Sequence, residues 1–345
     1  MPSELVFMFM KVLVTGGCGF IGSHFIRTSL AERPDWEIIN LDALTYAGNL
    51  ANTIDIQTNQ RYKFVYGSIV DKKIVDELVS LADVVVNIAA ETHVDRSIVD
   101  VEPFILTNIL GTQRVIDACV KHGKRFHHVS TDEVFGSLGP EDAKFNEHTH
   151  YDPRNPYAAT KAASDHLVRA AIHTHQLKAT ISNCTNNYGP FLYPEKFLSI
   201  AITNLIDGNP VLIHGDGHQV RDWIHAKDHA LGMIAIIEKG VVGETYMMGG
   251  DAEMSIADTA RSLLKVMGLT DHMLEFINDR PGQDRRYAID YGKIQRDLGW
   301  QPTVSFDQGL AEMVTWYRKN ESWWRAIRQG SAYREWFKQQ FGRVL

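Results

Sequence analysis

Short runs of β-branched and aliphatic residues alternate with amphipathic stretches through the first half of the chain. The run at residues 84–88, Val-Val-Val-Asn-Ile, is apolar on both faces, which is typical of a central parallel strand that is covered by helices. We expect strands at residues 11–15, 37–42, 62–66, 84–87, 126–130 and 179–184. Residues 23–32 and 107–121 have the periodicity of intervening helices. This alternation predicts an α/β fold with a doubly wound parallel sheet and right-handed crossovers.

The regular pattern weakens after about residue 186, where prolines and glycines cluster. We expect a first domain over residues 1–185, which also receives 222–247, and a smaller mixed α/β domain over 186–345. Within the returning segment, residues 226–239 predict a helix and 244–249 a strand. The aromatic residues of the tail, 323–341, predict a C-terminal helix docked on the core, with a partner-binding surface as the alternative.

Composition narrows the class of protein. A chain of 345 residues has room for two domains, and its net charge of -7 argues against a nucleic-acid partner. Cys18, Cys119 and Cys184 are few, odd in number and far apart, which favours a reducing cytoplasm over a disulfide framework. No apolar run is long enough to span a membrane. The first nine residues lack the pattern of a signal peptide and are expected to be an extension, with Met10 as an alternative start.

A glycine-rich loop follows the first expected strand. Gly16, Gly19 and Gly22 form G-x-x-G-x-x-G, which allows a tight turn, close approach to a pyrophosphate and close helix–strand packing. The helix that begins there offers N–H groups to phosphate. Asp42 ends the next strand, where a carboxylate binds the ribose hydroxyls of NAD and repels the 2′-phosphate of NADP; a turn-forming aspartate is the alternative. The first domain is therefore predicted to be a Rossmann domain that binds NAD.

A tyrosine and a lysine share one face of a later helix. Asn155 suits its N-cap and Pro156 its first turn, and Tyr157 and Lys161 are four residues apart. A nearby ammonium favours the phenolate form, so Tyr157 is a candidate base for a hydroxyl proton while hydride leaves the carbon. Thr131, at the end of a preceding strand, is a candidate hydrogen-bond partner for the same oxygen. Tyr-x-x-x-Lys also occurs by chance on solvated helix faces, and the upstream glycine loop favours the catalytic interpretation.

Two adjacent acids follow Thr131. Oxidation at C4 of a hexose makes the C5 hydrogen acidic, so Glu133 suits a base at C5 and Asp132 an acid toward the departing C6 hydroxyl. These roles require unlike environments. Because neighbours in a strand point to opposite faces, we expect the pair in a turn just past the strand. A helix-capping pair of acids is the alternative.

The residues described so far resemble the extended short-chain dehydrogenase/reductase family, the NAD-dependent epimerases and dehydratases, and within it the dTDP-glucose 4,6-dehydratases. The resemblance extends from about Lys11 to the C-terminus. It rests on TGGCGFIGS, LDALTYAGN, AAETHVDRSI, STDEVFG, PYAATKAASDHLVRA, NCTNNYGP, PEKF, GDGHQVRDW and DRPGQDRRYAID. It implies a cycle of oxidation at C4, loss of water across C5 and C6, and hydride return to C6, which yields a nucleotide-linked 4-keto-6-deoxyhexose.

The resemblance also implies binding residues. Those for NAD are Phe20, Ile21, Ala43, Leu44, Thr45, Ser68, Ile69, Ala89, Ala90, Glu91, Thr107, Tyr157, Lys161 and Asn187. Those for the nucleotide sugar are Thr92, Thr131, Asn186, Lys196, Phe197, Leu212, His214, Arg221, Arg280, Gln283 and Asp284. Arg221 suits a bidentate pyrophosphate clamp, with a surface ion pair as the alternative.

Four positions depart from the family pattern. Ser68 replaces the usual Asp beside the adenine, and Ala252 lies near a frequent Asn. Gln283 replaces the His of a PGHD segment, and His214 replaces a common Tyr. These departures leave the catalytic motifs intact, and they leave the nucleotide base open.

Other interpretations keep part of the pattern. A 4-epimerase or decarboxylase of the same fold would keep Tyr157 and Lys161 without needing both acids, and an NAD-sensing regulator would need none of these residues. His225 and His229 have a spacing that some metal sites use, but no third ligand accompanies them, so no metal is expected. The resemblance implies a homodimer that pairs through residues 107–121 and 157–175.

Overall fold

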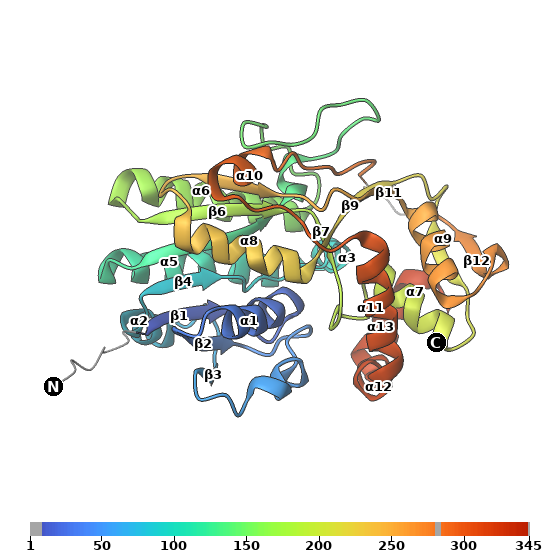
Figure 1. The fold of residues 1–345 in the computed structure, drawn as a ribbon, viewed down its shortest axis with the longest axis horizontal. Helices are drawn as coiled ribbons and strands as arrows, with labels where there is room; N and C mark the ends of the chain where they lie inside the picture. Colours follow the sequence, from blue (N-terminus) through green and yellow to red (C-terminus); the bar gives the residue numbers. More distant parts are fainter. Residues whose placement is uncertain (1–8, 280–283, 344–345) are drawn as a thin grey trace. The chain divides into compact units, whose positions relative to one another are not determined.

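The computed structural model describes residues 9–279 and 284–343, and the chain forms two compact units (Figure 1). Of the described residues, the first unit takes 9–187, 221–253 and 284–303. The second unit takes 188–220, 254–279 and 304–343. The predicted extension at residues 1–8 lies outside the described residues.

A seven-stranded parallel sheet forms the centre of the first unit, in the order β10-β6-β5-β4-β1-β2-β3. Its strands are β1 (Met10–Thr15), β2 (Trp36–Asp42), β3 (Tyr62–Tyr66), β4 (Val84–Asn87), β5 (Arg125–Thr131), β6 (Ala179–Cys184) and β10 (Thr245–Met248). The predicted doubly wound parallel sheet is confirmed. The predicted strand at 244–249 does return to it, as the edge strand beside β6. Because β1 pairs with β2 on one side and β4 on the other, the strand order reverses where the glycine loop leaves the sheet.

Helices cover both faces of this sheet. Val12 and Val14 of β1 belong to the same apolar cluster as residues of α1 and α8, and Leu13 belongs to the cluster of α2, α5 and α6. The helices of this unit are α1 (Phe20–Glu32), α2 (Lys72–Leu81), α3 (Val94–Val99), α4 (Glu102–Phe104), α5 (Thr112–His122), α6 (Pro156–His175), α8 (Ala226–Lys239) and α10 (Gly292–Leu298). Two 3-10 turns, η1 (Leu50–Ile56) and η3 (Asp132–Phe135), complete it. The two-sided cover explains why the central strands are apolar on both faces.

The helix predicted at residues 107–121 is regular only in its second part. Residues Ile105–Gly111 form a π-helix, η2, that continues directly into α5. Inside it, the buried side chain of Asn108 exchanges hydrogen bonds with the backbone N–H and carbonyl of Glu91 at 2.9 and 3.0 Å. The predicted helical segment is therefore helical throughout, but its first five residues belong to a π-helix, at a position where a side chain binds a neighbouring loop.

The first unit also contains residues 284–303, which the sequence placed in the second domain. Trp300 donates a hydrogen bond from its indole N–H to the carbonyl of Asp228 at 3.0 Å, and its ring lies in the cluster of α1 and α8. Thr303 donates to the Asp228 carboxylate at 2.7 Å, and Ile289 bridges to Phe145. These are contacts between segments far apart in the chain, so local periodicity does not reveal them.

The second unit is smaller and mixed. A parallel pair, β8 (Val211–His214) and β12 (Leu274–Ile277), packs with α7 (Phe197–Ile206), η4 (Asp271–Met273), α9 (Ile256–Met267), α11 (Phe306–Lys319), α12 (Glu321–Gln329) and α13 (Ser331–Phe341). The tail is thus two helices that meet at Gly330, where one helix was predicted. Its rings do dock on a core, since Tyr333, Trp336 and Phe337 cluster with Ile200 and Leu212.

Three short strands form a further sheet in the order β11-β9-β7. They are β7 (Asn186–Tyr188), β9 (Val220–His225) and β11 (Glu253–Ser255), and the chain passes from one unit to the other within each of them. No helix of the described residues is long and apolar enough to cross a membrane.

Candidate active site

The loop between β1 and α1 leaves no room for side chains at its glycines. Gly16 has a φ of +74°, and a Cβ atom at Gly22 would lie 2.2 Å from the carbonyl oxygen of Gly16. Gly19 is the N-cap of α1 and has no side chain to cap it. The N–H groups of a first helical turn have no partner within the helix, so this end of α1 suits an anion. The geometry fits the predicted pyrophosphate site.

Asp42 at the end of β2 binds the glycine loop directly. Its carboxylate accepts hydrogen bonds from the backbone N–H groups of Cys18 at 2.8 Å and Leu44 at 2.7 Å. Burial raises the pKa of Asp42, and these two hydrogen bonds oppose that rise. Asp42 therefore fixes the loop, as a turn-forming aspartate would. Carboxylate oxygens accept several hydrogen bonds, so the same group can also bind a ribose hydroxyl.

Most other residues predicted to bind NAD lie beyond the carboxyl ends of neighbouring strands. Phe20 and Ile21 begin α1, Ala43, Leu44 and Thr45 follow β2, Ser68 and Ile69 follow β3, and Ala89, Ala90 and Glu91 follow β4. Thr107 lies in η2 and Asn187 in β7. Burial raises the pKa of Glu91, while a hydrogen bond from Thr45 lowers it, so this carboxyl joins the loops after β2 and β4. Parallel strands place these loops at one edge of the sheet.

Asn108 is a residue that sequence analysis missed. Besides its bonds to Glu91, its amide donates to the hydroxyl of Thr160 at 3.0 Å, and that hydroxyl donates to the carbonyl of Tyr157 at 2.8 Å. The π-helix therefore links the loop after β4 to the first turn of α6. Asn108 could have been found from the sequence only if the π-helix had been recognised, and the spacing of apolar residues does not distinguish a π-helix from an α-helix.

The two acids lie in the turn that follows β5, as predicted. Thr131 is the N-cap of η3, and its hydroxyl accepts a hydrogen bond from the N–H of Glu133 at 3.3 Å. Asp132 is 2% exposed, and within the described residues its Oδ2 atom has no hydrogen-bond partner. Burial, and then the negative charge of Glu133, raise the pKa of Asp132 to about 8. Glu133 is only half-buried and accepts a hydrogen bond from Asn155 at 3.3 Å. The neighbours thus occupy unlike environments.

The first turn of α6 has the predicted cap. The side chain of Asn155 accepts a hydrogen bond from the N–H of Ala158 at 2.8 Å, and Pro156 is in the first turn. Burial and the charge of Glu133 raise the pKa of Tyr157 well above its usual value, although a hydrogen bond with Thr131 lowers it. The expectation that the phenolate is already favoured is therefore wrong for the protein by itself, because burial and neighbouring negative charges outweigh other effects.

Lys161 is buried one turn after Tyr157. Its ammonium donates a hydrogen bond to the carbonyl of Val129 in β5 at 2.7 Å. Burial lowers the pKa of Lys161, whereas Asp165 and the thiol of Cys184 raise it. Neither Asp165 nor Cys184 was singled out as a site residue from the sequence, since a buried acid and a lone cysteine have no local motif.

Arg221 lies beside an aromatic ring. Its guanidinium carbon is 4.4 Å from the centre of the Tyr287 ring, and its Nη2 atom donates to the carbonyl of Asp284 at 3.0 Å. Burial raises the pKa of Tyr287, and the charge of Glu133 raises it further, whereas Arg221 lowers it. Tyr287 therefore belongs to the surroundings of Glu133, and sequence analysis missed it because it lies 154 positions later in the chain.

The other residues predicted to bind the nucleotide sugar fall in both units. Thr92 and Asn186 belong to the first unit, and the buried Oδ1 atom of Asn186 has no hydrogen-bond partner within the described residues. Lys196, Phe197, Leu212 and His214 belong to the second unit. Lys196 is the N-cap of α7, which begins at Phe197, and Leu212 is buried in the aromatic cluster of α13. Arg280 and Gln283 lie outside the described residues.

The histidines considered as metal ligands have other contacts. His225 is the N-cap of α8, and Nδ1 of His229 lies 2.9 Å from the Asn187 side-chain oxygen. The described part of the chain contains no cluster of three His, Cys, Asp or Glu residues that could hold a metal ion. All three cysteines are buried thiols, and burial raises the pKa of Cys18 to about 12.

Comparison with known proteins gives consistent matches. A family model described as GDP-mannose 4,6 dehydratase matches residues 13–313. The dTDP-glucose 4,6-dehydratase of Mycolicibacterium smegmatis is 45% identical over 321 residues, 92% of this chain and 96% of that protein. That of Neisseria meningitidis is 43% identical over 344 residues, 93% of this chain and 97% of that protein.

Solved structures agree. The crystal structure of the dTDP-glucose 4,6-dehydratase DesIV from Streptomyces venezuelae, with NAD and dTDP bound, has a TM-score of 0.89 and 44% identity, covering 92% of this chain and 100% of that one. The UDP-glucuronic acid 4-epimerase of Bacillus cereus has a TM-score of 0.84 and 29% identity, covering 90% of this chain and 99% of that one.

Proposed function

The chain belongs to the nucleotide-sugar 4,6-dehydratase family, together with the dTDP-glucose 4,6-dehydratases, and we propose that it converts dTDP-glucose to the 4-keto-6-deoxy sugar. The reaction comprises oxidation at C4, loss of water across C5 and C6, and reduction at C6. One observation carries the assignment of the dehydration step. Asp132 and Glu133 are adjacent in one turn, both act electrostatically on Tyr157, and only Asp132 is fully buried.

The protein's residues fit NAD as the resident cofactor. The glycine cradle that Cβ atoms would fill suits the pyrophosphate, and Asp42 suits the adenosine ribose. Tyr157 and Lys161 suit the nicotinamide end, and Ser68 in the loop after β3 suits the adenine. The loops after β2 and β4 carry other residues proposed to bind NAD. When bound, NAD supplies reversible hydride acceptance. Because the same sugar is oxidised and then reduced, NAD is expected to remain bound, and free NADH should not accumulate during turnover.

The three reactive side chains divide the proton transfers. Tyr157 takes the proton of the C4 hydroxyl as the phenolate, with Thr131 as hydrogen-bond partner of that oxygen. Burial and Glu133 oppose that ionisation in the protein by itself, and the positive charge of a nicotinamide ring bound beside the phenol, together with Lys161, would favour it. Glu133 takes the C5 proton once the C4 ketone has made it acidic, and returns a proton to C5 when hydride is added at C6. Asp132, which burial keeps protonated at neutral pH, gives its proton to the departing C6 hydroxyl, which leaves as water. General acid–base groups with separated pKa values suit this division.

The first unit is proposed to bind NAD, and the second to bind the nucleotide part of the substrate. Arg221 is proposed to clamp the pyrophosphate, since guanidinium binds phosphate oxygens in pairs. Thr92, Asn186, Lys196, Phe197, Leu212, His214, Arg280, Gln283 and Asp284 are the further substrate residues proposed. Three departures lie within the described residues: Ser68 is expected to affect adenine recognition, and Ala252 and His214 to affect recognition of the nucleotide base.

The decisive experiment is incubation of the purified chain with dTDP-glucose and with UDP-glucose. Mass spectrometry should detect loss of one water, and absorbance in alkali should detect the keto sugar. The matched variant Glu133→Gln keeps the size of the side chain and removes the base, so dehydration should fall strongly. Undiminished turnover of a nucleotide sugar by this variant would instead indicate an epimerase or decarboxylase. Tight NAD binding without turnover of any nucleotide hexose would indicate a regulator.

We also propose that the chain works as a homodimer in the cytoplasm. The apolar side chains of Ile98, Val99, Ile105 and Leu106 are exposed at 58%, 78%, 45% and 41% beside the stretch expected to pair. Burial of such side chains against a second copy would be favourable. Sedimentation equilibrium should give twice the chain mass, and Ile98→Asp with Leu106→Asp should give monomers.

A further inference from the structure

A fully buried carboxylate lies directly behind the catalytic residues. Asp165 is on α6, one turn after Lys161 and two turns after Tyr157, and it is 0% exposed. Its Oδ2 atom accepts hydrogen bonds from the hydroxyls of Ser130 at 2.9 Å and Tyr151 at 2.8 Å. Residues four and eight positions apart share a helix face, so this carboxylate, the ammonium and the phenol follow one line along α6.

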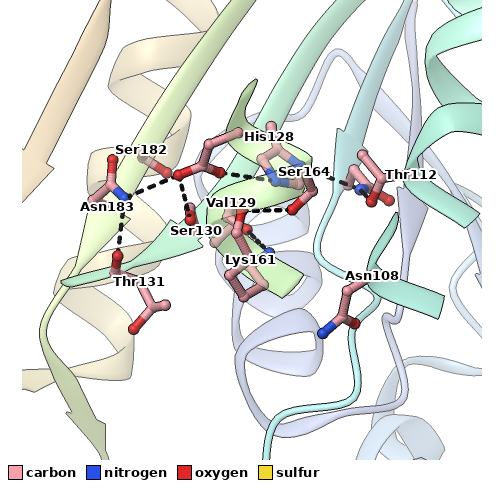
Figure 2. A network of polar contacts seen from close by, with 12 residues as sticks. Asn108, Thr112, His128, Val129, Ser130, Thr131, Lys161, Ser164, Ser182 and Asn183 are labelled. Carbon is pink, nitrogen blue, oxygen red and sulfur yellow. Dashed lines mark hydrogen bonds and ion pairs between the residues drawn. The ribbon is translucent and has the colours of Figure 1, made fainter. Parts of the chain in front are cut away.

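The same carboxylate is joined to the end of β5. The amide of Asn183 lies 3.5 Å from Oδ2 of Asp165 and donates to the carbonyl of Thr131 at 2.9 Å. His128, also on β5, lies 3.3 Å from Oδ1 through its Nε2 atom. Figure 2 shows His128, Ser130, Asn183 and Thr131 gathered around this network, with Lys161 bonded to the carbonyl of Val129. The network therefore connects the helix of Tyr157 to the strand end that leads into the two acids.

Among the groups of this network, one carries a negative charge that can balance the positive charge of Lys161. The charge of the ammonium interacts with Asp165 on its own helix, with His128 on β5 and with Cys184 on β6. Tyr157 lies one turn earlier on the same helix. Burial raises the pKa of Tyr157 and raises that of Cys184 to about 12, so both are neutral at pH 7. Burial and the charge of Lys161 lower the pKa of His128 to about 4, so it is neutral as well.

Asp165 is the member of this set that carries a negative charge. Burial opposes its ionisation, but hydrogen bonds with His128 and Tyr151 and the positive charge of Lys161 lower its pKa. Arg169 donates a hydrogen bond to the hydroxyl of Tyr151 at 3.1 Å, and this hydroxyl in turn donates to Asp165. Arg169 thus adds a positive charge one residue removed from the carboxylate. An isolated buried ammonium tends to lose its proton, and an opposite charge nearby preserves it.

We propose that Asp165 is a positioning residue for the reaction, whose fixed negative charge keeps Lys161 protonated and whose hydrogen bonds hold the end of β5 against α6. The test by activity rests on the proposed function. The test by stability rests on the fold alone. Asp165 does not touch the sugar. It acts through Lys161 and through Ser130, next to Thr131.

The first test is a stability cycle on the full chain with Asp165→Asn, Lys161→Met and the double variant. Each single change leaves one buried charge without its partner, whereas the double change removes both. The thermal midpoint of the double variant should therefore lie above that of either single variant. Folding of the double variant alone would support the proposal equally. Additive losses, or failure of both Asp165→Asn and the double variant to fold, would overturn it.

The second test is the pH dependence of kcat with dTDP-glucose. In the wild type, one alkaline fall begins at about pH 8, where Asp132 loses its proton, and a second begins where Lys161 loses its proton. In Asp165→Asn the second fall should begin about 1–3 pH units lower than in the wild type, because Lys161 loses its proton more easily. Tyr151→Phe removes one hydrogen bond to the same carboxylate but leaves its charge, so its alkaline fall should stay in place. A loss in Asp165→Asn that is uniform across pH would contradict the proposal. An inactive wild type would refute the proposed function, and the stability cycle would still decide the pairing.

Discussion

The loop after β1 and the turn after β5 leave the same edge of the sheet, but they are built from different parts of the chain. The glycine loop offers main-chain groups, and its geometry depends on side chains being absent at Gly16 and Gly22. The turn after β5 offers side chains, and its chemistry depends on how deeply Asp132 and Glu133 are buried. The glycine loop has no space for a Cβ atom at Gly16 or Gly22. The turn after β5 depends instead on the charge and the proton affinity of its two acids.

The largest expected effect is the loss of kcat when a reactive side chain beside the turn after β5 is removed. Tyr157→Phe removes the phenolic hydroxyl and keeps the ring against Phe104, whose centre is 6.4 Å away. Loss of a general acid–base group should lower kcat by about 10²–10⁴-fold. The keto-sugar assay measures this loss, and the amount of NAD that copurifies should not change. Tyr151→Phe is the matched control at a half-buried tyrosine, and an equal loss there would contradict a specific role for Tyr157.

The next effect comes from pH alone. Asp132 must be protonated to act as an acid, and burial together with Glu133 raises its pKa to about 8. The dehydration rate should therefore fall about tenfold per pH unit as the pH rises above about 8, because the protonated fraction falls in that ratio. Rates measured from pH 6 to 10 check this expectation. A rate that climbs through pH 9 would show that Asp132 acts in its charged form.

A smaller effect is expected in the backbone-built region. In Gly22→Ala the new Cβ would meet the carbonyl oxygen of Gly16 at 2.2 Å, so the helix must shift at a cost of about 1–3 kcal/mol. Copurified NAD should fall as well. Gly123→Ala is the matched control, since that glycine has a φ of +64° and open space around it. It should cost about 1 kcal/mol and leave NAD content unchanged; equal NAD loss in both variants would argue against a phosphate cradle.

The smallest effect concerns Asn155, which caps α6 and also donates a hydrogen bond to Glu133 in the turn after β5. Asn155→Ala removes the helix cap and should cost about 1 kcal/mol in the free energy of unfolding. Asn155→Asp keeps a capping oxygen but cannot donate to Glu133, so stability should be nearly retained while kcat falls several-fold. Chemical unfolding and the keto-sugar assay separate the two effects. Equal kcat for wild type and Asn155→Asp would show that the bond to Glu133 is dispensable.

Local chemistry explains what the sequence could predict. Apolar runs located six strands of the sheet to within one residue, and the 244–249 run located β10, because a covered parallel strand must be apolar. The cap at Asn155 and the turn at 132–135 also follow from residue type and neighbour geometry. The glycine spacing predicted a tight loop, and Gly16 and Gly22 in that loop have no space for a Cβ atom.

What the sequence could not predict depends on distant contacts. The return of residues 284–303 to the first unit rests on Trp300 and Thr303 binding Asp228, more than seventy positions earlier. The protonated state of Tyr157 rests on burial and on the charge of Glu133 in the turn after β5, and the Tyr-x-x-x-Lys motif contains neither. The carboxylate of Asp165 looks like an ordinary helix residue until Ser130, Tyr151 and Asn183 are placed around it.

The discontinuous path of the first unit constrains how the protein is made. Synthesis proceeds from the N-terminus, and domains generally fold as units while the chain emerges. Here the sheet lacks its edge strand until residue 248 has been translated, and the cluster of α1 and α8 lacks Trp300 for some fifty residues more. On the ribosome, the cofactor loop is therefore complete long before the core that supports it, and the nascent chain must protect that unfinished face for most of its elongation.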